Sequence, residues 1–220
     1  STRPICDKRI LSQEGMPRQS AVTLFGEWAR LGKDEGMESG HSPSVEQMID
    51  SVINRVPEQF SAIDVGCGNG WAARRLARLP GCYRSSGVDG SEQMVRKAKS
   101  IDPEGDYFVG NLPGWGPEEN VDLILSMEFI YYLDEPLQFF GTLHDDWLSS
   151  GGSVVFGLDH YLENESSTSW PDKLGIPMAT LSMEDWREGL ENAGFKDVET
   201  LQVCPKTDWP GTLVLIGTKA

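Results

Sequence analysis

Short apolar runs rich in β-branched and aromatic side chains alternate along the chain with longer amphipathic segments. The short runs have the length and composition of buried strands and are bounded by turn residues. Five strands are predicted, at residues 60–65, 83–89, 106–110, 121–126 and 152–159. Such runs are typical of strands that are covered on both faces of a sheet.

Three segments between these strands carry apolar residues at intervals of three and four, which predicts amphipathic helices. The segments lie at 69–79, 91–101 and 134–148. Crossover connections between parallel strands place helices on both faces of a sheet. The alternation therefore predicts an α/β fold with a doubly wound, mostly parallel sheet.

Two more helices are predicted before the first strand. Residues 42–56 carry an apolar stripe, and residues 22–31 carry a weaker one. Between them, the glycine-punctuated segment 32–41 has the composition of a loop. We expect residues 1–41 to form an N-terminal extension or lid.

The chain after the fifth strand begins with a long irregular segment, 159–181, which we expect to be a substrate-side loop because substrates are usually held at this edge of a sheet. A helix at 182–192 and two strands around 197–204 and 211–218 follow. A length of 220 residues supports one well-formed core, so residues 1–220 are predicted to be a single domain.

A glycine-rich turn joins the first strand to the next helix. The sequence IDVGCGNG contains Gly66, Gly68 and Gly70. Glycines suit a sharp strand-to-helix turn whose backbone approaches a ligand, because a β-carbon would be in the way. The spacing departs from the dinucleotide-binding fingerprint, since the bulky Trp71 follows where a small residue is needed.

Two acidic residues at strand ends indicate the charge of the ligand. Asp64 stands two residues before the first glycine, where a carboxylate repels a phosphate but attracts an ammonium or sulfonium group. Asp89 ends the second strand, where an acidic side chain can accept both hydroxyls of a ribose. The pair Gly32-Lys33 lacks the Ser or Thr that follows in a phosphate-binding loop. The pattern predicts a nucleoside that carries a cationic amino-acid tail.

The motifs, in this order, resemble those of the class I S-adenosylmethionine-dependent methyltransferases over residues 42–220. AIDVGCGNGWAARRLA is similar to the glycine-rich motif, GVDGSEQMVRKAK to the ribose-binding motif, and VDLILSMEFIYYL to the fourth motif. The resemblance implies S-adenosylmethionine as cofactor and a Rossmann-like, seven-stranded sheet whose last strand is antiparallel. It is strongest for the small-molecule branch that includes ubiquinone and menaquinone biosynthesis methyltransferases.

The same resemblance implies a set of cofactor contacts. Asp64 and the glycine loop would hold the methionine end, and Asp89 would hold the ribose. Gly90 and Met94 would border the adenine, with Asn111 in place of the aspartate that the family often has there. The full set is Asp64, Gly66, Cys67, Gly68, Gly70, Asp89, Gly90, Met94, Asn111 and Leu112.

Glu128, Tyr131 and His160 are predicted on the acceptor side. Glu128 and Tyr131 follow the fourth strand, which in this fold faces the transferred methyl group, although such an aromatic run is often only packing. His160 could act as a general base near neutral pH, although a lone loop histidine is more often solvated. His41 is a weaker candidate, and His144 is expected at the surface.

The net charge and the spacing of the cysteines limit the kinds of partner and ligand that we expect. The chain has 19 Lys and Arg against 34 Asp and Glu, a net charge of -15, so it repels a phosphate backbone and nucleic acid is not expected as a partner. No apolar run has the length of a membrane span, so no membrane partner is expected. The four cysteines are widely spaced without a metal-ligand pattern, which favours reduced thiols, a cytoplasmic location and no metal.

We therefore expect an enzyme that transfers a methyl group from S-adenosylmethionine to a small-molecule acceptor. Two alternatives stay open. One is a non-catalytic cofactor-binding or partner-binding module on the same scaffold, and the other is a methyltransferase of a protein substrate. The sequence leaves open the acceptor, the methylated atom and the oligomeric state.

Overall fold

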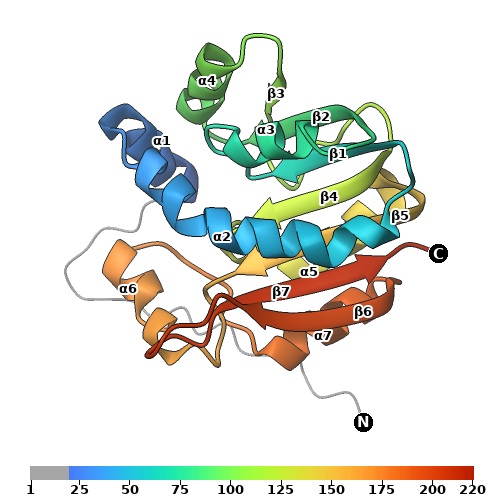
Figure 1. Ribbon diagram of the computed structural model, residues 1–220. Helices are drawn as coiled ribbons and strands as arrows, with labels where there is room; N and C mark the ends of the chain where they lie inside the picture. Colours follow the sequence, from blue (N-terminus) through green and yellow to red (C-terminus); the bar gives the residue numbers. More distant parts are fainter. Residues whose placement is uncertain (1–19) are drawn as a thin grey trace.

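The computed structural model describes residues 20–220 and contains a seven-stranded sheet between helices (Figure 1). The strand order is β3-β2-β1-β4-β5-β7-β6, and β7 is antiparallel to both of its neighbours. The strands are β1 (Phe60–Val65), β2 (Cys82–Asp89), β3 (Asp106–Val109), β4 (Val121–Met127), β5 (Leu148–Leu158), β6 (Lys196–Val203) and β7 (Thr212–Thr218). This topology confirms the predicted fold class.

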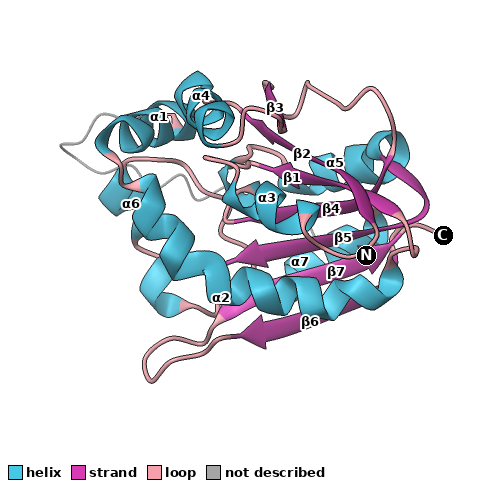
Figure 2. Cartoon of the chain, turned by 45° about the horizontal axis from the view of Figure 1, so that its top comes forward, coloured by secondary structure: helices cyan, strands magenta, loops and turns pink. Residues whose placement is uncertain are grey.

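Helices cover both faces of the sheet. Figure 2 shows α2 and α3 on one side and α5 and α7 on the other. The α-helices are α1 (Ala21–Leu31), α2 (Asp34–Val52), α3 (Trp71–Ala77), α4 (Glu92–Ile101), α5 (Pro136–Thr142), α6 (Trp170–Leu174) and α7 (Met183–Asn192). None of these described helices is long and apolar enough to cross a bilayer.

The central strand β4 is buried on both faces, which explains its nearly continuous apolar run. Leu123 and Leu125 are buried in the cluster that includes α2 and α3, while Ile124 between them is buried in the cluster that includes α5 and α7. Successive side chains on a strand point to opposite faces, so a doubly covered strand needs apolar residues at every position.

Most of the segment 32–41, predicted as a loop, is helical. From Asp34 onward it belongs to α2, which continues past Pro43 to Val52. Two glycines and a proline weaken the local helical preference, but tertiary contacts outweigh it. Asp34 is buried at one end, and Val45 is buried against the sheet further along the same helix.

The predicted helix 134–148 is too long at its carboxyl end. The α-helix α5 ends at Thr142, a π-helical turn spans Leu143–Trp147, and β5 begins at Leu148, four residues before its predicted start. Trp147 is fully buried in this turn. Packing of its indole ring and pairing of Leu148 with Val121 fix a boundary that the polar, glycine-rich sequence did not reveal.

Candidate functional site

A pocket lies at the carboxyl ends of β1, β2 and β4, beside the two N-terminal helices. Its lining combines the glycine loop after β1 with residues of α1 and α2 and the turn after β4. Eight of the predicted site residues meet there: Asp64, Gly66, Cys67, Gly68, Asp89, Gly90, Met94 and Glu128. Residues from five separate parts of the chain thus converge where parallel sheets usually bind their ligands.

Left-handed backbone conformations shape the glycine loop. Gly66 has a φ of 75°, and a β-carbon there would lie 2.4 Å from the ring of Phe129, so the position requires glycine. The backbone N–H groups of Gly66 and Cys67 both donate to the carbonyl of Val88, at 2.8 and 3.0 Å. These bonds tie the loop to the end of β2.

Asp64 is a buried carboxylate without a partner. Its residue is 4% exposed, and among the described residues no hydrogen bond or ion pair engages its side chain. Burial, with a further contribution from the charge of Asp89, raises the pKa of Asp64 to about 8. A cation bound beside it would restore the charged form.

Asp89 orders the loop as well as lining the pocket. One carboxylate oxygen accepts from the backbone N–H of Gly68 and the other from that of Ser91, both at 2.9 Å. Burial raises the pKa of Asp89, and the two N–H donors partly oppose this effect. Each carboxylate oxygen has a second lone pair, so both could still accept a ligand hydroxyl.

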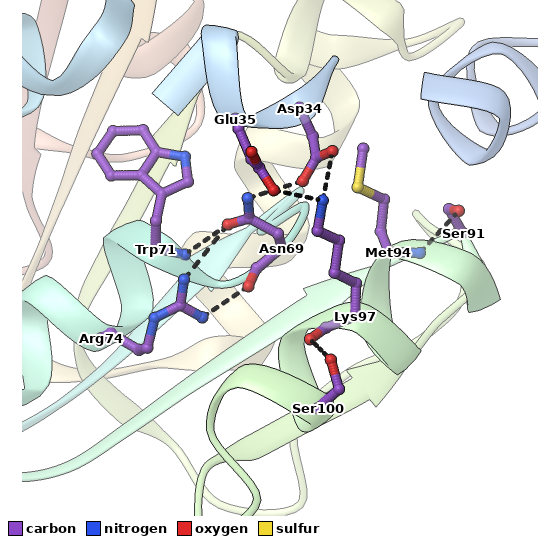
Figure 3. A network of polar contacts seen from close by, with 9 residues as sticks. All are labelled: Asp34, Glu35, Asn69, Trp71, Arg74, Ser91, Met94, Lys97 and Ser100. Carbon is purple, nitrogen blue, oxygen red and sulfur yellow. Dashed lines mark hydrogen bonds and ion pairs between the residues drawn. The ribbon is translucent and has the colours of Figure 1, made fainter. Parts of the chain in front are cut away.

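A buried polar network joins α2 to the glycine loop (Figure 3). The Asp34 carboxylate accepts from the Asn69 side-chain amide and from the Lys97 ammonium, both at 2.8 Å. The Asn69 carbonyl oxygens accept in turn from the backbone of Trp71 and the guanidinium of Arg74. Asp34 was not predicted as a site residue, because its segment was expected to be a loop. An acidic pair, Asp34 and Glu35, is typical of the first turn of a helix and was the local signal for α2.

Glu128 occupies a strained turn directly after β4. Its φ is 58°, unusual for a residue with a side chain, and its backbone N–H donates to the Gly157 carbonyl at 2.8 Å. Its carboxylate accepts from the Tyr131 hydroxyl and from the backbone N–H of Asp159. Burial, followed by the charge of Asp159, raises the pKa of Glu128 to about 8. Tyr131 is buried and does not line the pocket, and its hydroxyl holds the Glu128 carboxylate from the protein interior.

His41 and Asp159 lie beside Glu128. The Nε2 atom of His41 is 3.4 Å from a carboxylate oxygen of Asp159, and the other oxygen accepts from the Thr212 hydroxyl at 2.6 Å. Burial lowers the pKa of His41, but the two neighbouring carboxylates outweigh it and the pKa is raised. His41 lines the pocket. Asp159, at the end of the fifth predicted strand, was not proposed as a site residue.

His160 is neither solvated nor placed in the pocket. The residue is fully buried, Nδ1 donates to the Ser167 carbonyl at 2.9 Å, and Nε2 accepts from the Thr180 hydroxyl at 2.8 Å. Burial lowers its pKa to about 4. Both ring nitrogens serve to hold the 159–181 segment, and these contacts do not support a catalytic role.

His144 is also less exposed than predicted. Its side chain is 18% exposed, and its ring packs edge-on against Phe195 with centroids 5.0 Å apart. The polar neighbours of His144 in the sequence suggested a surface position, but the π-helical turn directs the ring toward the body of the domain.

Three predicted cofactor contacts do not line the pocket. Gly70 caps α3 with a φ of 84° and lies against the ring of Tyr107. Asn111 is exposed, and Leu112 packs on the main apolar cluster. The structure gives Gly70 a role in the turn and leaves the cofactor contacts of Asn111 and Leu112 as predictions.

Helix α1 supplies part of the pocket wall. Val22 and Phe25 line the pocket, and Phe25 packs edge-on against Tyr132 with ring centroids 5.2 Å apart. Trp28 instead borders a neighbouring hollow. The first 19 residues of the predicted extension lie outside the described part of the chain, and the lid function stays a prediction.

Comparisons with known proteins place this geometry in a class. Residues 63–156 match a family model described as a methyltransferase domain. A chain from a complex between the Haloferax volcanii Trm112 methyltransferase activator and a methyltransferase is 27% identical, with a TM-score of 0.75 over 88% of this chain and 96% of that one. Residues 63–156 are therefore similar to a methyltransferase domain, and the chain has the Rossmann-like fold of these proteins.

The curated relatives are methyltransferases by name. Trans-aconitate 2-methyltransferase of Rhizobium etli is 28% identical over 66% of this chain, and malonyl-[acyl-carrier protein] O-methyltransferase 1 of Ilyobacter polytropus is 30% identical over 63%. The match spans 54% of each relative, about half its length. These comparisons support S-adenosylmethionine, the predicted cofactor, while the quinone branch stays a prediction.

The unpaired carboxylate of Asp64 predicts a stability change of unusual sign. A buried acid whose pKa is raised from 3.8 to about 8 costs free energy as pH rises between these values. Asp64→Asn should therefore be more stable than wild type at pH 8, by up to about 5 kcal/mol, and the gain should shrink toward pH 4. Urea unfolding at the two pH values measures the difference. The exposed Glu104→Gln serves as control. A variant less stable than wild type at pH 8 would contradict this assignment.

Proposed function

We propose that the protein transfers the methyl group of S-adenosylmethionine to a small molecule held between α1, α2 and the segment after β4. The observation that carries the proposal is the buried, unpaired carboxylate of Asp64 beside a loop whose glycines adopt left-handed backbone conformations. The amino group of the cofactor would neutralise Asp64, and Asp89 would accept from the ribose hydroxyls. The name of the trans-aconitate relative supports this class of acceptor.

Methyl transfer from a sulfonium is an in-line displacement, so the protein mainly holds the two reactants close, aligned and dry. The cofactor supplies the electrophilic methyl group. Phe25 and Tyr132 exclude water from the acceptor side, and Phe129 packs directly on the loop at Gly66. The cytoplasmic location and the absence of a nucleic-acid partner remain predictions from composition.

Replacing the ribose-binding carboxylate tests the cofactor site. Asp89→Ala should weaken S-adenosylmethionine binding tenfold or more in calorimetry, because a hydrogen bond to a charged group is worth roughly 1.5 to 3 kcal/mol. Glu104→Gln should leave the affinity unchanged. Unchanged affinity in the Asp89 variant would remove the assignment. Binding without formation of S-adenosylhomocysteine with any acceptor would favour the non-catalytic alternative.

We also propose that the chain binds an activator protein, since the similar Haloferax volcanii chain was solved in complex with Trm112. Strand β3 supports this proposal. It is an edge strand of four residues, and Phe108 and Val109 on it are 36% and 46% exposed. Tyr83, on the neighbouring strand β2, is 68% exposed. An unpaired edge with exposed apolar side chains suits the addition of a partner strand.

Mixing the chain with purified Haloferax volcanii Trm112 tests this edge. Size-exclusion chromatography should show a complex that Val109→Asp disrupts, because a charge would be buried at the added strand. The matched control is Leu201→Asp on β6, the opposite edge of the sheet, where the side chain is 38% exposed. No complex, or loss of it in the β6 variant alone, would overturn the proposal.

A further inference from the structure

The acceptor side of the pocket places one carboxylate among aromatic and sulfur-containing side chains. Phe25, Phe129, Tyr132 and Met37 line this side together with Glu128. Apolar walls exclude water, and the interaction between charges is stronger where water is excluded. A charged group that enters here would therefore feel Glu128 strongly.

The charges around Glu128 do not balance. The ligand atoms of His41, Glu128 and Asp159 all lie within 4.8 Å of one another. Two carboxylates against one imidazolium leave one negative charge when all three groups are ionised. An unpaired buried charge is costly, and the raised pKa of Glu128 reflects that cost. One additional positive charge would make the cluster neutral.

The described lining offers no free positive charge to an anionic acceptor. Among the described residues that line this pocket there is no Lys or Arg, and His41 is already beside Asp159. An acceptor carboxylate would thus face Glu128 without a cationic partner. The curated relatives are named for trans-aconitate and a malonyl thioester, both of which carry carboxylates, so this pocket differs in charge from what such acceptors need.

A metal ion is a poorer occupant than an ammonium group. Metal binding needs a neutral imidazole with a free lone pair, whereas the neighbouring carboxylates raise the pKa of His41 and favour its protonated form. Both oxygens of Glu128 already accept a hydrogen bond from the protein, yet each retains a lone pair for a further N–H donor. Aromatic faces add attraction for a cation.

We propose that the methyl acceptor is an amine, held in its ammonium form by Glu128 between Phe25, Phe129 and Tyr132. This inference rests on the proposed methyltransferase function and names its substrate class. The acceptor R–NH₃⁺ gives one proton to the Glu128 carboxylate, and the freed nitrogen lone pair forms a bond to the methyl carbon. The carbon–sulfur bond breaks, and its electron pair stays on sulfur. The products are R–NH₂⁺–CH₃ and S-adenosylhomocysteine, and Glu128 returns its proton to water.

Matched pairs of ligands test the charge preference. With the protein saturated by S-adenosylhomocysteine, 2-phenylethylamine and tryptamine should bind at least tenfold more tightly than 3-phenylpropionate and indole-3-propionate. Glu128→Gln should weaken amine binding tenfold or more and leave S-adenosylmethionine affinity within twofold of wild type. The exposed Glu188→Gln, on α7, is the control. In turnover assays with S-adenosylmethionine, mass spectrometry should find the methyl group on nitrogen.

The outcomes separate this inference from the function on which it rests. A protein that binds S-adenosylmethionine and methylates trans-aconitate or a propionate probe, while no amine of the panel binds, overturns the amine assignment alone. A protein that binds no S-adenosylmethionine overturns the proposed function. If Mg²⁺ or Zn²⁺ alone raised the melting temperature of wild type but not of Glu128→Gln, the cluster would be a metal site and the amine proposal would fail.

Discussion

Two carboxylates whose charge is not fully balanced, Asp64 and Glu128, carry the proposals made for this pocket. Taking an ionised carboxylate out of water is expensive, and a protein normally compensates with a nearby cation or with protonation. Asp64 and Glu128 both have a pKa raised to about 8, chiefly by burial. Each is therefore poised to release a proton when a cation arrives, one at the cofactor end and the other at the acceptor end.

Helix α2 connects these two ends. Its first turn places Asp34 against Asn69 of the glycine loop, and two turns later His41 reaches Asp159 beside Glu128. Ser44, one turn further on, is hydrogen-bonded at 2.8 Å to Thr212, which also holds Asp159. One continuous helix thus orders both halves of the pocket, and a change in its position would alter both.

Much of the fold was predictable because its signals are local. The alternation of buried strands with amphipathic helices, the glycine loop and the two strand-end aspartates all stand in contiguous sequence. The errors arose where distant contacts outweigh local preference. The glycines before Pro43 suggested a loop, although burial of Asp34 and Val45 keeps the segment helical, and the burial of Trp147 sets a boundary that no local pattern marks.

The candidate site was predictable to the same degree. The predicted cofactor half lies at the ends of two strands whose motifs are contiguous, and most of its residues line one pocket, while their contacts with the cofactor stay predictions. The acceptor half combines His41, Glu128 and Asp159 from three separate segments, and only their spatial meeting gives them meaning. His160 shows the reverse case, since its chemistry suggested a base but its burial and two hydrogen bonds give it a structural role.

Proton release on cofactor binding tests most directly whether Asp64 is protonated in the free protein and ionises when a cation binds beside it. Titration calorimetry with S-adenosylmethionine at pH 7, in two buffers of different ionisation enthalpy, counts the protons exchanged. We expect wild type to release protons and Asp64→Asn to release fewer, because the cofactor ammonium favours the ionised carboxylate. Proton uptake, or the same release in both proteins, would contradict it.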